Sequence, residues 1–471
     1  VFYPLIAPRH LAQEGWHYEL EDPEDPLIFK GVVFNEMKGA YSSPDNVFER
    51  YNQQSLFPNN AYGHDSGGDP AVIPDLTYEQ FKAFHDTLYH PSNARIFFYG
   101  DDDPEKRLRL MDEWLRDFDQ IEVNSLVSLQ EPFAEPKRLT HSYNVDGDVA
   151  EAKGMVQVNW MLPENTDPAL TMALSILSYA LVSTPASPLR KALIDSGLGE
   201  DVTGGGFSPS LRQMTFGVGL KGIAVDDADK VEALILQTLA ELAEDGLEPD
   251  MVEAAVNTIE FNLRENNTGN FPRGLSLVLR ALRTWLYDRD PLQSLAFEEP
   301  LTAVKNQLTN NPIYLQDLIR QYLLDNPHRS TVILEPDAEL AQRLEAAEKA
   351  RLAEVKAGLS EAELQAIIDE TRELKRLQET PDTPEVLATI PRLTLADLDK
   401  ENKTIPLAIS DLHGSELLYH DLFTNGIIYL DLGFDLHTLP ADLLPYVKLF
   451  GRALVEMGTE PEDFVKLSQR I

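Results

Sequence analysis

Residues 154–163 read GMVQVNWMLP, and this stretch decides the fold class. Together with RLTHSYNV at 138–145, it predicts two β-strands. Helical patterns follow through residue 323, and long helices are expected at 167–184, 226–245 and 249–266. RSTVILEP at 329–336 then closes the segment as another strand. Because strands and helices come in blocks, the sequence predicts an α+β fold.

The residues before this segment also mix helices with strands. Helices are expected at 27–40, 46–57 and 76–91. Ser43 or Asp45 is a candidate cap for the second of these helices, and Pro91 ends the third. The apolar stretch NARIFFYG at 93–100 predicts a strand.

Three consecutive aspartates open the stretch DDDPEKRLRLMDEWLRDF at 101–118. Asp103 at the N-cap and Pro104 at the first helical position predict the start of a helix. A calcium loop is the alternative interpretation, but the spacing and the glycine of an EF-hand are missing. Capping is therefore the favoured role of these aspartates.

The second half of the chain is organised around a long run of helix-forming residues. Residues 119–136 are expected to be a linker, and residues 337–380 to form an antiparallel helical hairpin broken at Gly358–Ser360. A proline-punctuated strap follows at 380–398, and a new α/β segment starts near 405. In that segment we expect a β-hairpin that turns at Asn425-Gly426 and a helix that ends at Gly458.

Two glycine-rich stretches invite a functional interpretation. HDSGGDP at 64–70 contains a tetrapeptide found near the nucleophile of trypsin-like enzymes, but that fold is all β, so a turn is favoured. TGGGF at 203–207 lacks the Gly-Lys-Ser/Thr of a P-loop, so a flexible turn before a strand near 212–220 is expected.

Length and composition bound the remaining possibilities. The chain has 471 residues, which corresponds to about three domains of ordinary size. Its net charge of −38 argues against nucleic acid or an anionic membrane as the main partner and is compatible with basic peptides. The absence of cysteine excludes disulfides and thiolate sites, so a metal would need His and carboxylate ligands. Without a run of about 18 apolar residues, no membrane-spanning helix is expected.

The two ends of the sequence suggest a piece of a longer chain. Val1 is not an initiator Met, and VFYPLIAPRHL has neither a signal-peptide nor a transit-peptide pattern. DFVKLSQRI at the other end stops inside an amphipathic pattern. We therefore expect a fragment, or a product of cleavage.

Glu36 is the carboxylate with the most unusual place in the pattern. It falls on the predicted apolar stripe of the 27–40 helix, which comprises Phe29, Val32, Val33, Met37 and Ala40. An ionised carboxylate on such a face is costly unless it pairs with a cation or binds a metal. A position at the rim or an ion pair with an arginine is the alternative.

The histidines do not form a recognisable metal motif. His10, Glu14 and His17 share one face if residues 10–17 are helical, although Gly15 and the alternation in WHYEL favour a strand. His85 and His90 are five residues apart and diverge on a helix. Neither pair has the spacing of HExxH or HxxEH, so structural roles are favoured.

Three stretches of the sequence carry a family resemblance. KGVVFNEMKGAYSSPDN (30–46), GGDPAVIPDLTYEQFKAFHDTLYHPSNARIFFYGDDDP (67–104) and SPLRKALIDSGLG (187–199) are similar to the presequence proteases. These form a branch of the pitrilysin/insulysin, or inverzincin, family of zinc metallopeptidases. The helical hairpin together with 372–398 resembles the domain peculiar to that branch, and 420–459 resembles the start of its second half.

The resemblance implies repeated pitrilysin-type domains joined by a helical hairpin. In each such domain, helices pack on a mixed, mostly antiparallel sheet. It assigns 1–118 to the C-terminal part of the catalytic domain and 137–336 to a second, non-catalytic domain. It assigns 337–400 to the hairpin linker and strap, and 401–471 to the start of a third domain.

The resemblance also implies a Zn²⁺ site. In the family, zinc is held by HxxEH on one helix and by a distal Glu, which Glu36 in FNEMKG matches. On this interpretation Glu36 faces a cleft rather than solvent. HxxEH is absent from this chain and lies upstream in the family, so no catalytic residue is expected here and the chain alone is expected to be inactive.

The function implied is a zinc-dependent endopeptidase that degrades unstructured peptides inside a closed chamber. Its partners would be extended, basic peptides and neither nucleic acid nor a membrane, and the full-length protein would be a monomer. The bacterial cytoplasm is the expected location, with the mitochondrial matrix or the chloroplast stroma as alternatives. A non-catalytic scaffold or peptide-binding subunit is the competing function.

Overall fold

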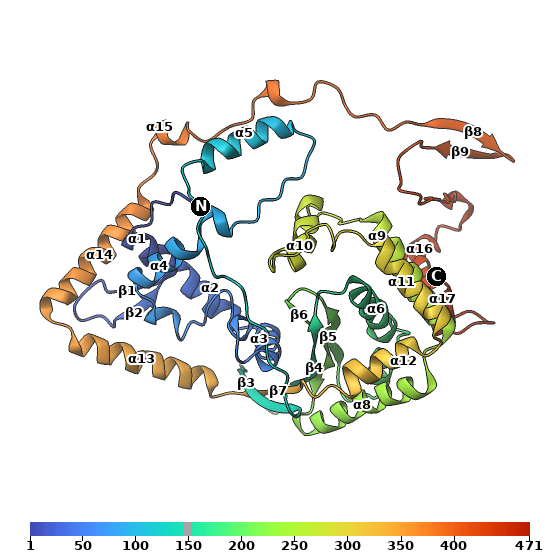
Figure 1. Ribbon diagram of the computed structural model, residues 1–471, viewed down its shortest axis with the longest axis horizontal. Helices are drawn as coiled ribbons and strands as arrows, with labels where there is room; N and C mark the ends of the chain where they lie inside the picture. The colour runs from blue at the N-terminus through green and yellow to red at the C-terminus, as the bar shows by residue number, and fades with distance from the viewer. Residues whose placement is uncertain (146–152) are drawn as a thin grey trace.

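Five strands from the middle of the chain form one mixed sheet in the order β3-β7-β4-β6-β5 (Figure 1). They are β3 (Lys137–Asn144), β4 (Gly154–Glu164), β5 (Asp201–Ser208), β6 (Gln213–Ile223) and β7 (Arg329–Asp337). β3 is parallel to β7, and the other neighbouring strands are antiparallel. The computed structural model describes residues 1–145 and 153–471. The predicted α+β class with a mixed, mostly antiparallel sheet is confirmed.

One face of the sheet is apolar because alternate residues of β4 point to the same side. Val156, Val158 and Trp160 are fully buried on this face, and the Trp160 indole N–H donates to the Leu323 carbonyl oxygen at 2.7 Å. The helices that share this core are α6 (Pro168–Ser178), α7 (Pro188–Asp195), α8 (Ala228–Asp245), α9 (Pro249–Glu265), α11 (Glu298–Asn310) and α12 (Tyr314–Ile319). The expected long helices near 167, 226 and 249 are therefore present.

The opposite face of the sheet is partly polar and is covered by α3 (Pro44–Leu56) from the N-terminal region. The Asn159 amide N–H of β4 donates to Asn52 Oδ1 at 2.9 Å, and the hydroxyls of Ser55 and Ser330 lie 2.6 Å apart. Phe48 packs beside these contacts against apolar residues of β7. Helices thus cover both faces of the sheet, with α3 forming the third layer.

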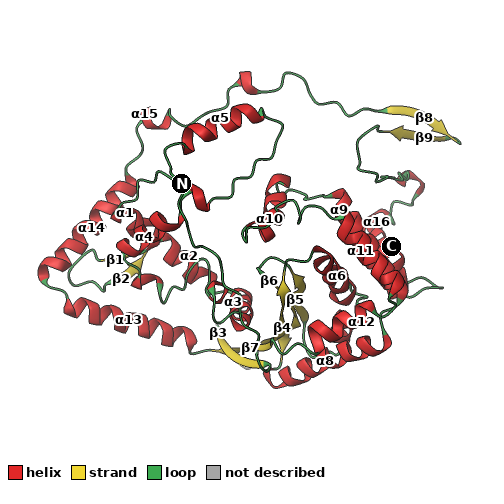
Figure 2. Cartoon of the chain, in the orientation of Figure 1, coloured by secondary structure: helices red, strands yellow, loops and turns green. Residues whose placement is uncertain are grey.

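The N-terminal region contains short strands and helices (Figure 2). They are α1 (Pro8–His10), β1 (His17–Glu19), β2 (Ile28–Lys30), α2 (Val32–Ala40), α4 (Tyr78–Leu88) and α5 (Pro104–Leu115). Ser43 occupies the N-cap of α3, and Asp103 caps α5 by accepting the backbone N–H groups of Glu105 and Lys106. The capping interpretation of the aspartate run is confirmed.

Two predictions for this region are wrong. Residues 27–40 do not form one helix, because Ile28–Lys30 pairs with His17–Glu19 and Gly31, at φ +150°, separates that strand from α2. Residues 93–100 form no strand, and Ile96, Phe98 and Tyr99 are exposed there. An apolar run needs a neighbouring strand to complete its hydrogen bonds, and no described residue pairs with this one.

The glycine-rich stretch at 203–207 is also a correction, because it lies inside strand β5 and is not a turn before the next strand. The pairing of β5 with β6 shifts register between Thr203 and Gly206. Gly204 and Gly206 have φ values of +80° and +73°, which glycine adopts at no steric cost. The glycines therefore build a bulge into an edge strand.

The helical residues 168–195 are long and apolar enough to cross a membrane by length and composition, contrary to the expectation from the sequence. They comprise α6, a π-helical turn at Tyr179–Ser183 and α7, with the non-helical residues 184–187 between the turn and α7. Half of the most apolar stretch of 18 residues is buried inside the molecule, where it packs on the sheet. This is the weak signal that the core helix of a soluble protein also produces.

The predicted helical hairpin consists of α13 (Leu340–Gly358) and α14 (Glu361–Glu379). Ser360 caps α14, and its hydroxyl and the Glu363 carboxylate form a capping box. The two helices diverge from this turn in Figure 1 and do not lie side by side, so the antiparallel pairing is wrong. Each helix packs instead on the N-terminal region.

The C-terminal residues form an extended strap and a few short elements. These are α15 (Pro384–Leu387), β8 (Ala408–Leu412), β9 (Ser415–Tyr419), α16 (Val447–Glu456) and α17 (Phe464–Arg470), and α10 (Arg273–Trp285) completes the described helices of eight residues or more. The hairpin turns at His413-Gly414, whose φ values are +54° and +85°, and not at Asn425-Gly426. Asn425 and Gly426 also have positive φ, but no described strands flank them.

A buried histidine links the N-terminal region, the extended segment 119–136 and the sheet. His328 is 1% exposed, its Nε2–H donates to the Leu56 carbonyl oxygen at 2.8 Å, and its Nδ1 accepts the Phe133 N–H at 3.1 Å. The imidazole also stacks on the Phe133 ring. Burial, aided by the charge of Lys137 and opposed by the bond to Leu56, lowers the pKa of His328 from 6.5 to about 4.

We predict that His328 makes the protein less stable as the pH falls. The unfolded chain binds a proton near pH 6.5 and the folded chain only near pH 4, so this contribution is complete above 6.5 and is lost between 6.5 and 4. The loss should reach about 3 kcal/mol. His328→Gln should remove this dependence in urea titrations, whereas His437→Gln, at a fully exposed ring, should retain it. If the free energy of unfolding changed equally with pH in the wild type and in His328→Gln, the role given to His328 would be contradicted.

Candidate functional site

The helix that carries Glu36 starts at a close backbone approach. Gly31 is the N-cap of α2, and a Cβ placed there would lie 2.2 Å from the Gly15 carbonyl oxygen. Its φ of +150° is also one that residues with a side chain rarely adopt. Glycine at position 31 therefore allows the chain to pass from β2 into α2 at this angle.

Glu36 lies in the middle of α2 and is exposed. The buried residue of this helix is Phe34, which belongs to a cluster with Phe29 and Ile73, whereas Val32 is 51% exposed. The predicted stripe is therefore wrong, because it was drawn through Phe29 as though that residue were helical. The expectation that Glu36 faces a cleft is corrected too, and its carboxylate forms no ion pair with any described residue.

The helical hairpin holds the N-terminal cluster around α2. Leu352 of α13 and Ile368 of α14 are 4% and 1% exposed in contact with this cluster. Lys38, two residues after Glu36, forms an ion pair with Glu348 of α13 at 2.8 Å. The Leu20 N–H donates to Thr371 Oγ1 of α14 at 3.3 Å. The orientation of α2 thus depends on both hairpin helices.

The histidines considered as metal ligands have structural contacts. His10 accepts the Ala7 N–H at the start of α1, and His90 accepts the Ser92 N–H. His85 stacks on Tyr89. Burial lowers the pKa of His17, whose Nδ1 contacts the Ala12 carbonyl oxygen at 2.5 Å.

The two other motifs from the sequence also have structural explanations. HDSGGDP forms turns in which Asp65 accepts the Gly67 N–H and the Tyr41 hydroxyl, and Asp69 pairs with Arg50 at 2.6 Å. Residues 10–17 divide into a helical part that ends at Gly15 and a strand that starts at His17, so neither a single helix nor a single strand describes them.

The described donor groups fall short of what zinc requires. A catalytic zinc site uses three protein ligands within about 2.0–2.3 Å of the ion. No group of three or more His, Asp or Glu side chains among the described residues is arranged to hold a metal ion. Glu36 could supply one carboxylate, but residues 1–145 and 153–471 do not make up a zinc site on their own.

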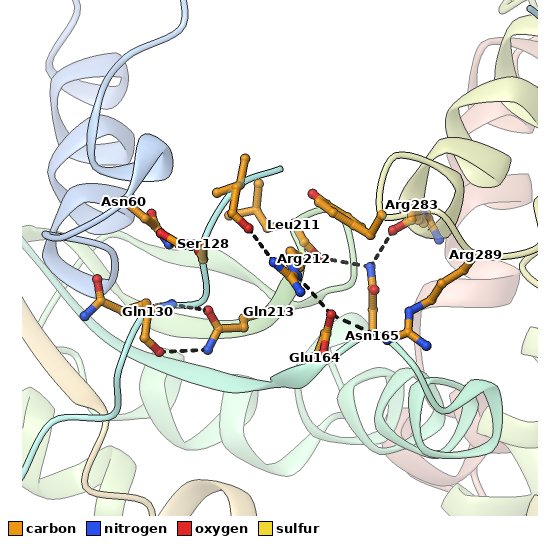
Figure 3. A network of polar contacts seen from close by, with 12 residues as sticks. Asn60, Ser128, Gln130, Glu164, Asn165, Leu211, Arg212, Gln213, Arg283 and Arg289 are labelled. Carbon is orange, nitrogen blue, oxygen red and sulfur yellow. Dashed lines mark hydrogen bonds and ion pairs between the residues drawn. The ribbon is translucent and has the colours of Figure 1, made fainter. Parts of the chain in front are cut away.

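A network of polar side chains fixes the extended segment 119–136 against the sheet (Figure 3). Gln130 and Gln213 form a reciprocal pair, in which the Gln130 N–H donates to Oε1 at 2.7 Å and the Gln213 amide donates back at 3.0 Å. Asn60 donates to the Ser128 carbonyl oxygen at 2.9 Å. These contacts join the N-terminal region to β6.

The same network continues to the far end of β4. Glu164 receives a hydrogen bond from Arg212 Nε at 2.9 Å and lies 3.6 Å from Arg289. Next to it, Asn165 donates to the backbone carbonyl oxygen of Arg283 at 2.8 Å (Figure 3). Sequence reasoning did not find these residues. The feature of the sequence that could have pointed to this region is the pair Arg280 and Arg283, which lie one turn apart on an apolar helix.

Comparison with known families gives two matches along the chain. The family model "Peptidase M16 inactive domain" matches residues 75–259, and the model of the region associated with subfamily C of the M16 peptidases matches residues 334–471. The chain belongs to the M16 peptidase family. The second match begins a few residues before the helical hairpin.

Curated relatives align with the whole chain. Presequence protease 1, chloroplastic/mitochondrial, of Arabidopsis thaliana is 49% identical over 100% of this chain and 44% of its own length. Protein HypA of Clostridium perfringens is 40% identical, with 100% and 48% covered, and the mitochondrial presequence protease of Xenopus laevis is 36% identical, with 100% and 46% covered. The chain spans about half the length of these relatives.

A solved structure supports the fold. The crystal structure of a protease from Helicobacter pylori superposes with a TM-score of 0.50 at 18% identity, covering 65% of this chain and 70% of that chain. At this identity the likeness concerns the arrangement of helices and strands alone.

We predict that Gly31→Ala lowers the stability of the chain by at least about 2 kcal/mol, because it combines a strained φ with a clash against Gly15. Gly39→Ala in the same helix is the matched control, since a Cβ at Gly39 meets nothing within 4 Å. That control should be neutral or stabilising by up to about 1 kcal/mol. Urea denaturation midpoints of the two variants test the difference. Equal midpoints would contradict the role given to Gly31.

Proposed function

We propose that this chain is part of a zinc-dependent endopeptidase that degrades unstructured peptides. The observation that carries the proposal is the 49% identity, over the whole chain, to a protein named presequence protease 1. The two family matches are consistent with it. Peptide substrates follow from the same relatives, whose names describe them as proteases of presequences.

Glu36 is the residue proposed to bind zinc. Its carboxylate is exposed on a helix that is held on several sides, so it is accessible to ligands from another part of the protein. The family resemblance supplies those ligands from an HxxEH helix. Because the described residues do not complete the site, no catalytic step is assigned to them, and the chain alone is proposed to be inactive.

The roles proposed for the parts of the chain follow the domains inferred from the sequence. Residues 1–118 would belong to the metal-binding domain, 137–336 to a non-catalytic domain, 337–400 to the linker and 401–471 to the next domain. The hairpin would join two halves that enclose the substrate, and closure would exclude water from the reaction. The full-length protein is proposed to be a monomer.

A non-catalytic scaffold is the second candidate function. The observation that favours it is the description of the model matching 75–259, which is that of an inactive peptidase domain. Peptidase activity of the full-length protein separates the two candidates, because a scaffold binds peptides without cleaving them.

The proposed location is the cytoplasm of a bacterium, with the mitochondrial matrix or the chloroplast stroma as alternatives. Relatives named for both organelles support the alternatives, and a Clostridium perfringens relative supports the bacterial location. The absence of cysteine is compatible with a reducing compartment in each case.

We predict that Glu36→Gln abolishes peptidase activity and strongly reduces zinc content in the full-length protein, because a charged ligand is lost. Glu49→Gln, at an exposed glutamate of α3, is the matched control and should retain both. In the 471-residue chain the Glu36 change should alter stability by less than about 0.5 kcal/mol, as expected at an exposed site. Normal zinc content and activity in full-length Glu36→Gln would refute the assignment.

We also predict that the 471-residue chain holds no stoichiometric zinc after dialysis, because one carboxylate cannot replace three ligands. Metal analysis of the purified chain is the measurement. About one tightly held zinc per chain would reveal a site that the described side chains do not suggest.

The net charge of −38 predicts a preference for basic, extended peptides. An acidic field raises the capture rate of cations, and the gain shrinks as the Debye length falls from about 10 Å at 0.1 M salt to about 3 Å at 1 M. The measurement is kcat/KM of the full-length protein for matched basic and neutral peptides at both salt concentrations. Equal values for the two peptides throughout would leave solubility as the role of the charge.

A further inference from the structure

A cavity of about 270 Å³ lies between helices α6, α9, α10 and α11, at the end of strand β4. Apolar side chains supply part of its lining, including Met172, Ile259 and Phe297. Two arginines of α10, Arg280 and Arg283, also line it, and no described Asp or Glu does. Its volume is slightly below the range of about 300–1,000 Å³ typical of sites for drug-sized ligands. It is therefore suited to a single residue or a similarly small group.

The two arginines carry positive charge without a balancing carboxylate. Residues three apart on a helix are neighbours, so both guanidinium stems leave the same face of α10. Neither arginine forms an ion pair with a described residue, and the Arg280 guanidinium donates only a long bond, 3.4 Å, to the Leu295 carbonyl oxygen. Burial lowers the pKa of both, and for Arg283 the charge of Arg280 adds to the effect.

Two neighbouring arginines without a carboxylate partner are unexpected in so acidic a chain. Arg264 on the neighbouring helix α9 is matched by Glu260 at 2.8 Å. Two half-buried, adjacent and uncompensated guanidiniums cost free energy that an anion in the cavity would offset. A carboxylate suits them because guanidinium forks bind it through paired hydrogen bonds.

Asn165 forms part of the cavity wall at the end of β4. It is 6% exposed and lines the same cavity. Its amide N–H₂ donates to the carbonyl oxygens of Arg283 and Leu211 at 2.8 and 3.1 Å, which fixes the orientation of the amide. Asn165 Oδ1 then has no hydrogen-bond partner among the described residues, although it is buried. Because this oxygen has almost no accessible surface, the groups that a ligand in the cavity meets are the arginines and the apolar lining.

We propose that this cavity binds the carboxyl-terminal residue of a peptide. Such a residue has a carboxylate for Arg280 and Arg283 and an apolar side chain for the lining. Inorganic phosphate lacks the apolar group. The proposal deepens the function proposed above, since its ligand is a peptide, but binding is measured without cleavage and can fail separately.

The test uses the full 471-residue chain and the probe acetyl-Ala-Ala-Phe with either a free carboxylate or a carboxamide. Isothermal titration should show binding of the acid at least tenfold tighter than that of the amide. Arg283→Gln and Arg280→Gln should each weaken binding of the acid at least tenfold and leave the amide unchanged. Arg273→Gln, at an exposed arginine of the same helix, is the matched control and should bind like the wild type.

Three outcomes would overturn the proposal. They are equal affinity for the acid and the amide, unchanged binding in both arginine variants, and arginine-dependent binding of inorganic phosphate without binding of the peptide acid. Thermal unfolding of each variant checks that it folds, and the loss of an uncompensated charge is expected to leave the transition unchanged or raise it. The two proposals fail separately. Peptide binding without zinc-dependent cleavage by the full-length protein would contradict only the proposed function, and cleavage without this binding would contradict only the cavity proposal.

Discussion

The arrangement of the chain depends on the need to satisfy polar side chains buried between the central sheet and α3. Gln157 and Asn159 are 8% and 3% exposed, and Ser330 is fully buried. A buried polar group without a hydrogen-bond partner costs about 1–3 kcal/mol. Asn52 and Ser55 of α3 provide partners for Asn159, at 2.9 Å, and for Ser330, at 2.6 Å, while the Gln157 amide donates to Asn159 Oδ1 at 2.6 Å. The helix therefore has one orientation on the sheet in which the polar groups match.

Glu36 takes its position from that match. Helix α2 ends at Ala40 and α3 begins at Pro44, so only three residues separate the helix that carries Glu36 from the helix docked on the sheet. On its other side, α2 is held by the apolar cluster that includes Leu352 and Ile368 of the hairpin. The Lys38–Glu348 ion pair is largely exposed and contributes at most about 1 kcal/mol, so burial holds the hairpin in place.

The sequence predicted the local features well and the long-range ones poorly. Strands β3, β4 and β7, the cap at Asp103 and the break between the hairpin helices at Gly358–Ser360 follow from neighbouring residues, and the sequence predicts them. The strand at 93–100 failed because an apolar run does not reveal whether a partner strand is present. The β-hairpin turn was predicted at Asn425-Gly426, whereas the paired strands flank His413-Gly414. Both pairs end in glycine, and the local sequence does not show which of them has strands that meet on either side.

The candidate site was predictable only through resemblance. Nothing in the spacing of residues 27–40 distinguishes Glu36 from an ordinary exposed glutamate, and the stripe drawn through it included Phe29 of a strand. The lack of carboxylate partners at Arg280 and Arg283 was not predictable either, because ion pairing depends on which helices meet in space.

The charges nevertheless suggest how the proposed zinc site and the cavity beside α10 would cooperate. A net charge of −38 disfavours the approach of anions and favours that of cations. A cavity with two uncompensated arginines reverses that preference locally. A basic peptide would thus be attracted along its length and held by its carboxyl end, which gives the bound chain a direction.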